Sequence, residues 1–349
     1  MTSGIPDSIM ALVVKQDGYN PNPEGGIHFE TMEPYLEFKE IAVPDLAAGQ
    51  VLVGMAMAPI NPSDLHFLKG EYGQPRRAGK PAGFEGVGTV IAAGEDPYAQ
   101  SLIGTRVSFA ATPDGTGTWA THAVAEAMLC IPQPDSVGDH DAAGFIVNPL
   151  TAAAMFEEAK AAGSPGIVLT AGASQVSKFI VALARDSGLD SICIVRRDVH
   201  NQVLTDLGAT VILNQTEDDF AAELTSTMKE RKPRFFIDAV ADATSTQVFN
   251  AMGKDSTWMI YGSLSPETPP LPNTGELIFR NKVIKGFWLS PWLSGAALDE
   301  KLAVFAEVQA RFSDGRWSTE VGATVKLDSA VETLVEALAD PRGKVFIQP

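Results

Sequence analysis

The sequence has little cysteine. Only Cys130 and Cys193 occur among its 349 residues, too few for a disulfide framework or a cysteine-rich zinc lobe in a chain of this length. Each lies within an apolar run, MLCIP or ICIV, so both are expected to be small buried side chains that serve packing.

Long apolar runs and basic clusters are also missing. No window of about 18 uncharged apolar residues exists, which excludes a membrane-spanning helix, and MTSGIPDSIM lacks the basic and apolar regions of a signal peptide. The 26 Lys and Arg residues against 43 Asp and Glu give a net charge of −17, without a Lys/Arg run to offset it. Without a membrane helix or a signal peptide, the sequence predicts a soluble, cytoplasmic protein. Because the negative charge repels a phosphate backbone, it also predicts no nucleic-acid partner.

The hydrophobic pattern changes along the chain. From about residue 10 to 135, short alternating runs separated by Gly/Pro turns indicate an antiparallel β-rich domain. From about residue 140, strands alternate with amphipathic helices, which predicts βαβ crossovers and a doubly wound parallel sheet. The last strand–helix–strand segment is too short to fold alone. We therefore predict an α/β protein with a β-rich domain at 1–138 and 300–349 and a doubly wound domain at 139–299.

A dinucleotide-binding turn is predicted within IVLTAGASQVSKFIVALARD, residues 167–186. The G-x-G-x-x-G fingerprint is incomplete, because its three positions hold Gly172, Ser174 and Ser177. Such a turn needs small side chains and free backbone N–H groups at a helix N-terminus, where the helix dipole favours an anion. The predicted cofactor-binding residues here are Gly172, Ser174, Gln175 and Val176. The alternative is an ordinary strand–turn–helix with a serine N-cap.

Two arginines follow the next strand, in ICIVRRD. An acidic residue about 20 residues after the turn suits the ribose hydroxyl of NAD, whereas an arginine suits the 2′-phosphate of NADP. Arg196 and Arg197 therefore favour NADPH, since a planar guanidinium can pair with a phosphate and stack on adenine. Asp198 leaves NADH use open, and a pair of solvated loop charges is the alternative interpretation.

Four segments together resemble one protein family. They are APINPSDLHFLKGEYG at 58–73, PAGFEGVGTVIAAGED at 81–96, NPLTAAAM at 148–155 and KGFWLSPW at 285–292. They resemble the medium-chain dehydrogenase/reductases, and in particular the zinc-free branch of NADPH:quinone oxidoreductases and trans-2-enoyl thioester reductases. The resemblance implies a GroES-like catalytic domain, a Rossmann domain, an active site in the cleft between them, and a homodimer formed along the strand at 282–289.

The zinc ligands of the metal-dependent relatives are absent from the matching positions. Asn61 stands where those relatives carry a cysteine, and Phe84 stands before Glu85 where they carry a histidine. The five histidines show no paired ligand spacing, and a catalytic zinc needs three protein ligands. We therefore predict no metal, and we expect His66, which resembles a proton-relay histidine, to be packed or hydrogen-bonded.

The resemblance also implies individual roles. Tyr72 resembles the tyrosine that enoyl reductases place near the substrate carbonyl, and Asn61 resembles the asparagine near the nicotinamide; these two are the predicted catalytic residues. The further predicted cofactor-binding residues are Asn148, Thr151, Tyr261, Gly262, Phe287, Trp288 and Lys344. The alternatives are a tyrosine packed at a turn, an Asx-turn before Pro62, and aromatic residues that belong to the core.

The sequence thus predicts a zinc-free, NADPH-dependent oxidoreductase that transfers hydride to a quinone or to an activated double bond of an enone or enoyl thioester. Phe67, Phe84, Trp288 and Trp292 would line a cleft with little charge, which suits a small apolar or aromatic electron acceptor. The alternative is a non-catalytic NADPH-binding sensor or stress protein of the same fold, which the two missing glycines favour.

Overall fold

The computed structural model describes residues 5–112, 115–339 and 343–349, and the chain divides into two compact units. The first unit is formed by Met1–Pro23, Ile27–Asn148 and Glu307–Pro349, and the second by Glu24–Gly26 and Pro149–Ala306. Both boundaries lie later in the chain than the predicted positions 138 and 300, because the division falls inside two helices, α4 (Val147–Ala161) and α11 (Leu298–Ser313).

The first unit is built on a seven-stranded sheet. Its order is β14-β15-β3-β4-β5-β7, with β6 paired to β3. All its pairs are antiparallel except β14 with β15. The strands are β3 (Gln50–Pro59), β4 (Glu85–Ala93), β5 (Arg106–Ala110), β6 (His122–Glu126), β7 (Cys130–Pro132), β14 (Val321–Lys326) and β15 (Lys344–Gln348). A separate antiparallel pair joins β1 (Ser8–Val14) to β2 (Leu36–Ala42).

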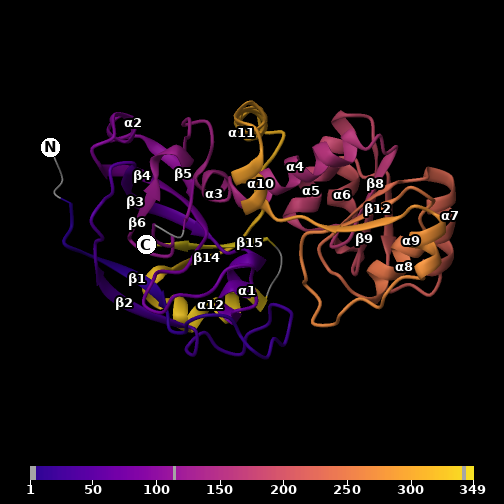
Figure 1. The fold of residues 1–349 in the computed structure, drawn as a ribbon, viewed down its shortest axis with the longest axis horizontal. Coiled ribbons are helices and arrows are strands. Elements are labelled where there is room, and N and C mark those ends of the chain that lie inside the picture. Colours follow the sequence, from indigo (N-terminus) through magenta and orange to yellow (C-terminus); the bar gives the residue numbers. More distant parts are fainter. Residues whose placement is uncertain (1–4, 113–114, 340–342) are drawn as a thin grey trace. The chain divides into compact units, whose positions relative to one another are not determined.

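The last strand of the chain lies beside an early one. Phe346 of β15 pairs with Pro59 of β3, and the Ile60 N–H donates to the Val345 carbonyl at 2.9 Å. Figure 1 shows the yellow C-terminal strands against the purple strands of this unit. This register brings Lys344 beside the segment that follows β3, where Asn61 lies.

Helices cover the first sheet and its edges. They are α1 (Pro62–Lys69), α2 (Pro97–Ser101), α3 (Asp139–Ala143) and α12 (Ala330–Ala339), with 3₁₀ turns η1 (Ala127–Leu129) and η3 (Leu327–Ser329). Helix α1 was not predicted from the sequence. It begins with a proline at its first position and ends at Gly70, whose φ of 73° is the left-handed conformation that glycine adopts readily.

The second unit contains a six-stranded sheet in which every pair is parallel. Its order is β10-β9-β8-β11-β12-β13, the arrangement of a doubly wound dinucleotide-binding fold. The strands are β8 (Gly166–Leu169), β9 (Asp190–Val195), β10 (Val211–Asn214), β11 (Phe235–Asp238), β12 (Thr257–Ile260) and β13 (Val283–Gly286). The strand order progresses in one direction from β8 to β10 and in the opposite direction from β11 to β13, so β8 and β11 flank the topological switch point. Ligands of such sheets bind outside the carboxyl ends of the strands at this point.

Helices lie on both faces of the second sheet. They are α5 (Gln175–Asp186), α6 (Asn201–Leu207), α7 (Phe220–Arg231), α8 (Ala243–Ala251), α9 (Thr274–Phe279) and α10 (Leu289–Gly295), with the 3₁₀ turn η2 (Asp198–His200). Helix α5 packs against α6 and α7 against α8, and Figure 1 shows these pairs on opposite sides of the sheet. The apolar positions 176, 179, 180 and 183 of α5 are all buried, as the helical period requires.

Several predictions of the sequence are confirmed here. The α/β fold with a β-rich unit and a doubly wound unit is present, and both cysteines are free and buried. Burial raises the pKa of each cysteine thiol to about 12, so neither is a reactive thiolate.

The predicted strand at 282–289 is shorter than expected, because β13 ends at Gly286 and α10 begins at Leu289. No helix in the described parts of the chain is both long enough and apolar enough to cross a membrane.

Candidate active site

The turn between β8 and α5 lies at the switch point of the second sheet. The Gly172 N–H donates to the Ile194 carbonyl at 2.9 Å, so the turn passes directly against β9. A Cβ added to Gly172 would lie 2.8 Å from the Cβ of Cys193 and 3.1 Å from the Ile194 oxygen. Only glycine fits this position without a shift of the turn.

Serines occupy the other two fingerprint positions and close the turn with their hydroxyls. Ser174 is the N-cap of α5, and its Oγ accepts from the Ser177 N–H at 3.3 Å. The buried Ser177 hydroxyl donates to the Thr170 carbonyl at 3.4 Å. Gln175 and Val176 form the start of the helix, where backbone N–H groups have no intrahelical acceptor. Both the N-cap interpretation and the anion-binding interpretation are compatible with this geometry.

Tyr261 lies against the same turn. It follows β12, and hydrogen bonds join its hydroxyl to Ser174 and Ser177, while burial raises its pKa. The next residue, Gly262, is held close to the end of β11, because a Cβ there would lie 2.8 Å from the Ala239 oxygen. The structure therefore brings the predicted residues Tyr261 and Gly262 to the predicted cofactor turn.

Arg196 and Arg197 follow β9 at its carboxyl end, and both side chains are exposed. Within the described residues neither guanidinium has a hydrogen-bond or ion-pair partner. The Asp198 carboxylate, in contrast, accepts from the side-chain amides of Asn201 at 3.2 Å and Asn214 at 3.0 Å. The two cations are thus available to an anionic ligand, whereas the neighbouring acid is engaged with its own loop.

Asp238 belongs to this region but was not predicted. It ends β11, is fully buried, and accepts hydrogen bonds from the Thr170 hydroxyl, the Val240 N–H at 3.0 Å and the Trp258 indole N–H at 2.9 Å. It therefore fastens the ends of β8, β11 and β12 together beneath the turn. An acid ending the buried run FFID is the only sequence signal that points to it.

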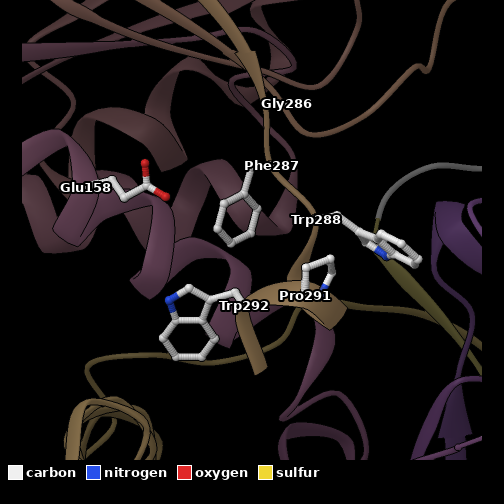
Figure 2. A pocket seen from close by; sticks show the side chains of 6 residues that line it. All are labelled: Glu158, Gly286, Phe287, Trp288, Pro291 and Trp292. Atoms are coloured by element: carbon white, nitrogen blue, oxygen red, sulfur yellow. The ribbon is translucent and has the colours of Figure 1, made fainter. Parts of the chain in front are cut away.

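Phe287 and Trp288 follow β13 and line a cavity of 390 Å³ in the second unit, together with Glu158, Gly286, Pro291 and Trp292. Figure 2 shows Phe287, Trp292 and the Glu158 carboxylate around one hollow, with Trp288 directed away from them. Lys285 forms an ion pair with Glu158, so the charge at this rim is neutralised. The cavity is otherwise aromatic and apolar.

The predicted catalytic residue Asn61 is buried in the first unit, directly before α1. Its Nδ2 donates to Glu85 Oε1 at 2.8 Å, and its Oδ1 accepts from the Lys344 ammonium. Its backbone N–H donates to Asp64 Oδ2 at 2.8 Å. Lys344 is thus placed at Asn61, which is also the N-cap residue of α1 directly before Pro62.

Three titratable groups surround Asn61, and all are buried. Burial raises the pKa of Asp64 to about 7 and also raises the pKa of Glu85. Burial lowers the pKa of Lys344, while the nearby carboxylates of Glu85 and Asp64 act in the opposite direction. Neither Glu85 nor Asp64 was assigned a role from the sequence, although Glu85 stands in the quoted motif GFEGVG.

Tyr72, the other predicted catalytic residue, packs on Phe84 with a ring-centroid distance of 5.2 Å. Phe84 also contacts Phe67 at 5.2 Å, and these two phenylalanines line a pocket of 120 Å³ within the first unit. The four aromatics predicted for one cleft therefore form two groups. Phe67 and Phe84 line the pocket of the first unit, and Trp288 and Trp292 line the cavity of the second.

Asn148 and Thr151 occupy the first turns of α4, where Asn148 is half-buried and Thr151 is buried. His66 lies in α1 between Leu65 and Phe67, both of which are core residues, and its Nε2 is shielded from solvent. This placement agrees with a packed histidine.

Two family models match the chain. Residues 47–135 match the alcohol dehydrogenase GroES-like domain, and residues 176–303 match the zinc-binding dehydrogenase. The mitochondrial enoyl-[acyl-carrier-protein] reductase of Bos taurus is 30% identical over 275 residues, which cover 76% of this chain and 71% of that protein. The corresponding protein of Dictyostelium discoideum is 28% identical over 270 residues, 73% of each chain.

Solved structures are similar over nearly the whole chain. A crystal structure from Mesorhizobium loti, with the provisional description NADPH:quinone reductase, has a TM-score of 0.94 and 48% identity, covering 99% of this chain and 100% of that one. The mitochondrial 2-enoyl thioester reductase heterodimer of Candida tropicalis has a TM-score of 0.79 and 22% identity, with coverage of 98% and 100%. The latter likeness is evidence for the fold alone.

The residues of this chain do not fit the zinc ion in the second model's description. Among residues 5–112, 115–339 and 343–349, no group of three or more His, Cys, Asp and Glu side chains could hold a metal. Beside Asn61, Asp64 Oδ2 accepts from a backbone N–H, both Glu85 oxygens accept from an amide and from backbone N–H groups, and the neighbouring cation is Lys344. An ammonium and a neutral amide are poor surroundings for a divalent cation.

Proposed function

Because this chain belongs to the medium-chain dehydrogenase/reductase superfamily, we propose that it is a zinc-free, NADPH-dependent reductase that transfers hydride to a quinone or to an activated carbon–carbon double bond. The observation that carries the proposal is the cofactor turn. The close approach of β9 requires a glycine in this turn at the switch point, and two arginines without a partner among the described residues follow β9. The enzyme class is an oxidoreductase and the cofactor is NADPH, as in the description of the 48% identical relative.

The residues at the turn fit a dinucleotide. The N–H groups at Gln175 and Val176 would receive the pyrophosphate, with Gly172 and Ser174 leaving room for its approach. Arg196 and Arg197 would pair with the 2′-phosphate, for which a guanidinium has the matching geometry. The rest of the cofactor, which supplies the hydride when bound, would be bordered by Tyr261, Gly262, Asn148, Thr151, Phe287 and Trp288.

Reduction of a polarised double bond also needs a donor for the developing negative charge and a proton for the α-carbon. We assign both tasks to the Tyr72 hydroxyl, which would donate a hydrogen bond to the substrate carbonyl oxygen and supply the proton for the α-carbon, regaining a proton from solvent water. Its ring is held by Phe84, so the phenol has a fixed direction at low entropic cost. Asn61 would orient the nicotinamide through its amide.

The acceptor in this proposal is small and apolar or aromatic. The pocket beside Phe67 and Phe84 and the cavity beside Phe287 and Trp292 have largely apolar linings, which suits an acyl chain or a flat ring. The relatives support both classes, since the curated ones are enoyl reductases and the relative from M. loti is described as a quinone reductase.

A homodimer is part of the proposal. Strand β13 is an edge of the second sheet, and its Val283 and Ile284 are exposed at 47% and 36%. Exposed apolar edge strands invite pairing with a second copy. Light scattering that gives the mass of one chain would contradict this part.

A second candidate is a non-catalytic NADPH-binding protein. One observation favours it: the hydroxyls of Ser174 and Ser177 are already bonded to each other, at 3.1 Å, and to Tyr261. The same reductase fold would then bind the cofactor without passing hydride on.

The test follows loss of reduced-nicotinamide absorbance with NADPH and NADH against quinones, simple enones and trans-2-enoyl-CoA esters, with and without a chelator. We expect oxidation of NADPH by one class, unchanged by the chelator. Chelator-sensitive turnover of alcohols or aldehydes would overturn the zinc-free assignment. Tight NADPH binding without oxidation by any acceptor would favour the binding protein.

A further inference from the structure

Charged and polar groups are concentrated in the interior of the first unit around Asn61. Asn61 and Asp64 are each 1% exposed, Glu85 is fully buried and Lys344 is 9% exposed. Charged side chains are rarely this buried, because removal from water costs several kcal/mol per ion unless partners compensate. Since an apolar core would be at least as stable, the arrangement calls for a task other than stability.

The Glu85 carboxylate connects two chain segments. Its Oε1 accepts from the Asn61 side chain at 2.8 Å, and its Oε2 accepts from the backbone N–H groups of Ile146 and Val147 at 2.8 and 2.9 Å. Those two N–H groups lie at the start of α4, where a negative charge is favourable. The three donors are satisfied only if both side-chain oxygens accept hydrogen bonds. An ionised carboxylate meets this condition, whereas a glutamine does not, because one of its two terminal atoms is a donor nitrogen.

Lys344 completes the arrangement from the other side of the amide. Its ammonium, which has donors only, bonds Asn61 Oδ1. The amide oxygen must therefore face Lys344 and the amide nitrogen must face Glu85. An asparagine NH₂ has two hydrogens, and Glu85 takes one of them, so the fixed orientation presents the second as a donor.

We infer that Glu85 and Lys344 are a positioning pair that locks the orientation of the Asn61 amide, so that Asn61 acts as a hydrogen-bond donor in the reduction. Glu85 also fixes the first turn of α4, which carries Asn148. Lys344 thereby serves to hold the amide. The inference rests on the proposed function, in which Asn61 works beside the nicotinamide.

A double-mutant cycle tests the pair. In Glu85→Gln, the Gln oxygen stays on the fixed N–H groups of α4 and its NH₂ turns toward Asn61, which makes the amide invert against Lys344. Glu85→Gln and Lys344→Met each remove the oppositely charged partner from a buried charge, so each lowers Tm. The double variant removes both charges and recovers much of the Tm, but the amide stays inverted.

In the double variant we expect Tm to recover while kcat stays low. We expect kcat to fall about 100-fold in Glu85→Gln and to stay low in the double variant, with a smaller change in the KM for NADPH. Recovery of kcat together with Tm would reduce the pair to a structural role and overturn the inference. A wild-type kcat in Glu85→Gln would do the same.

A second lysine–carboxylate pair, in which the lysine is buried and the carboxylate partly exposed, provides the control. In the second unit, Lys282 Nζ lies 2.6 Å from Glu276 Oε2, and Lys282 is 4% exposed. The cycle of Glu276→Gln and Lys282→Met should change Tm in the same manner and leave kcat within about threefold of wild type. A loss of kcat in this control equal to that in the Glu85 cycle would contradict a specific role for Glu85.

An activity-independent measurement separates this inference from the proposed function. With asparagine-selective ¹⁵N labelling, the Nδ2 proton that Asn61 donates to Glu85 should be shifted downfield and exchange slowly, and Asn61→Ser identifies its signal. We expect Glu85→Gln to abolish this signal. An unchanged Asn61 signal in Glu85→Gln would overturn the inference whichever acceptors the wild-type enzyme reduces, whereas absence of turnover in the wild type would overturn only the proposed function.

Discussion

The indole N–H of Trp258 donates to Asp238 Oδ2 at 2.9 Å, and both side chains are buried beneath the turn that follows β8. The other carboxylate oxygen accepts from Thr170 and from the N–H groups of Val240 and Ala241. One carboxylate therefore determines how the ends of three neighbouring strands meet where the cofactor is proposed to bind.

Removal of this carboxylate should be costly. Asp238→Ala leaves several buried donors without an acceptor, each worth about 1–3 kcal/mol, so the free energy of unfolding should fall by about 3 kcal/mol or more. Trp258→Phe removes one donor and should cost less than Asp238→Ala. Urea denaturation measures both, and an Asp238→Ala variant as stable as wild type would contradict the network.

The close approach of the turn to β9 predicts an effect of Gly172→Ala. Its Cβ would lie 2.8 Å from that of Cys193, so the turn must move, and we expect weaker NADPH binding and a loss of about 1–3 kcal/mol in stability. Gly253→Ala is the control, because nothing lies within 4 Å of its added Cβ. Fluorescence titration gives the Kd, and equal affinities of both variants and wild type would contradict the proposed placement of the cofactor.

The arginines after β9 should set the cofactor preference. Replacing Arg196 and Arg197 together by alanine removes charge-assisted hydrogen bonds worth about 1.5–3 kcal/mol each, so the Kd for NADPH should rise by about 100-fold or more. The Kd for NADH should change little, because NADH lacks the 2′-phosphate. Lys254→Ala removes an exposed cation elsewhere in the same unit and should affect neither cofactor. Equal losses for NADPH and NADH would contradict the assignment.

Tyr72→Phe separates the two acceptor classes. Loss of the phenol should lower kcat for an enone or enoyl thioester about 100-fold, the order expected for one donor to a developing oxyanion. Quinone reduction should be nearly unchanged, since hydride delivery alone suffices there. The packing on Phe84 survives in the variant, so the ring should keep its place. Full activity of Tyr72→Phe on both classes would leave Tyr72 with a packing role only.

Asp64 should make stability depend on pH. Burial raises its folded-state pKa to about 7 from the ordinary value of 3.8, so between about pH 4 and 7 the folded chain keeps a proton that the unfolded chain has lost. Its contribution to stability is therefore present at low pH and is lost as pH rises, by about 4 kcal/mol in total. Asp64→Asn removes this contribution. Parallel pH profiles of unfolding free energy for both proteins would contradict the assignment.

The sequence predicts most of the architecture because local patterns determine it. Strands of four to six residues that alternate with amphipathic helices were sufficient to predict the parallel sheet. Gly172 was predicted as the glycine of the cofactor turn from its place between a strand and a helix. Helix α1 was missed in a segment that was interpreted as β-rich, although Pro62 at its start and Gly70 at its end are ordinary helix boundary signals.

The polar networks could not be predicted in the same way. Lys344 meets Asn61 across 283 positions of sequence, and the contact exists only because β15 pairs with β3. Asp238 receives donors from β8 and β12, whose neighbourhood follows from strand order and not from sequence spacing. Buried acids such as Glu85 are recognised only once their donors are located.

The proposed function requires that hydride passes from NADPH to an acceptor on this protein. A single-turnover experiment tests this step, in which NADPH carrying deuterium at the transferred position is mixed with the best acceptor among the quinones, enones and enoyl-CoA esters. We predict oxidation within one turnover, slower for the deuterated cofactor than for the unlabelled one. Bound NADPH that stays reduced in the presence of every acceptor would contradict the claim and favour the binding protein.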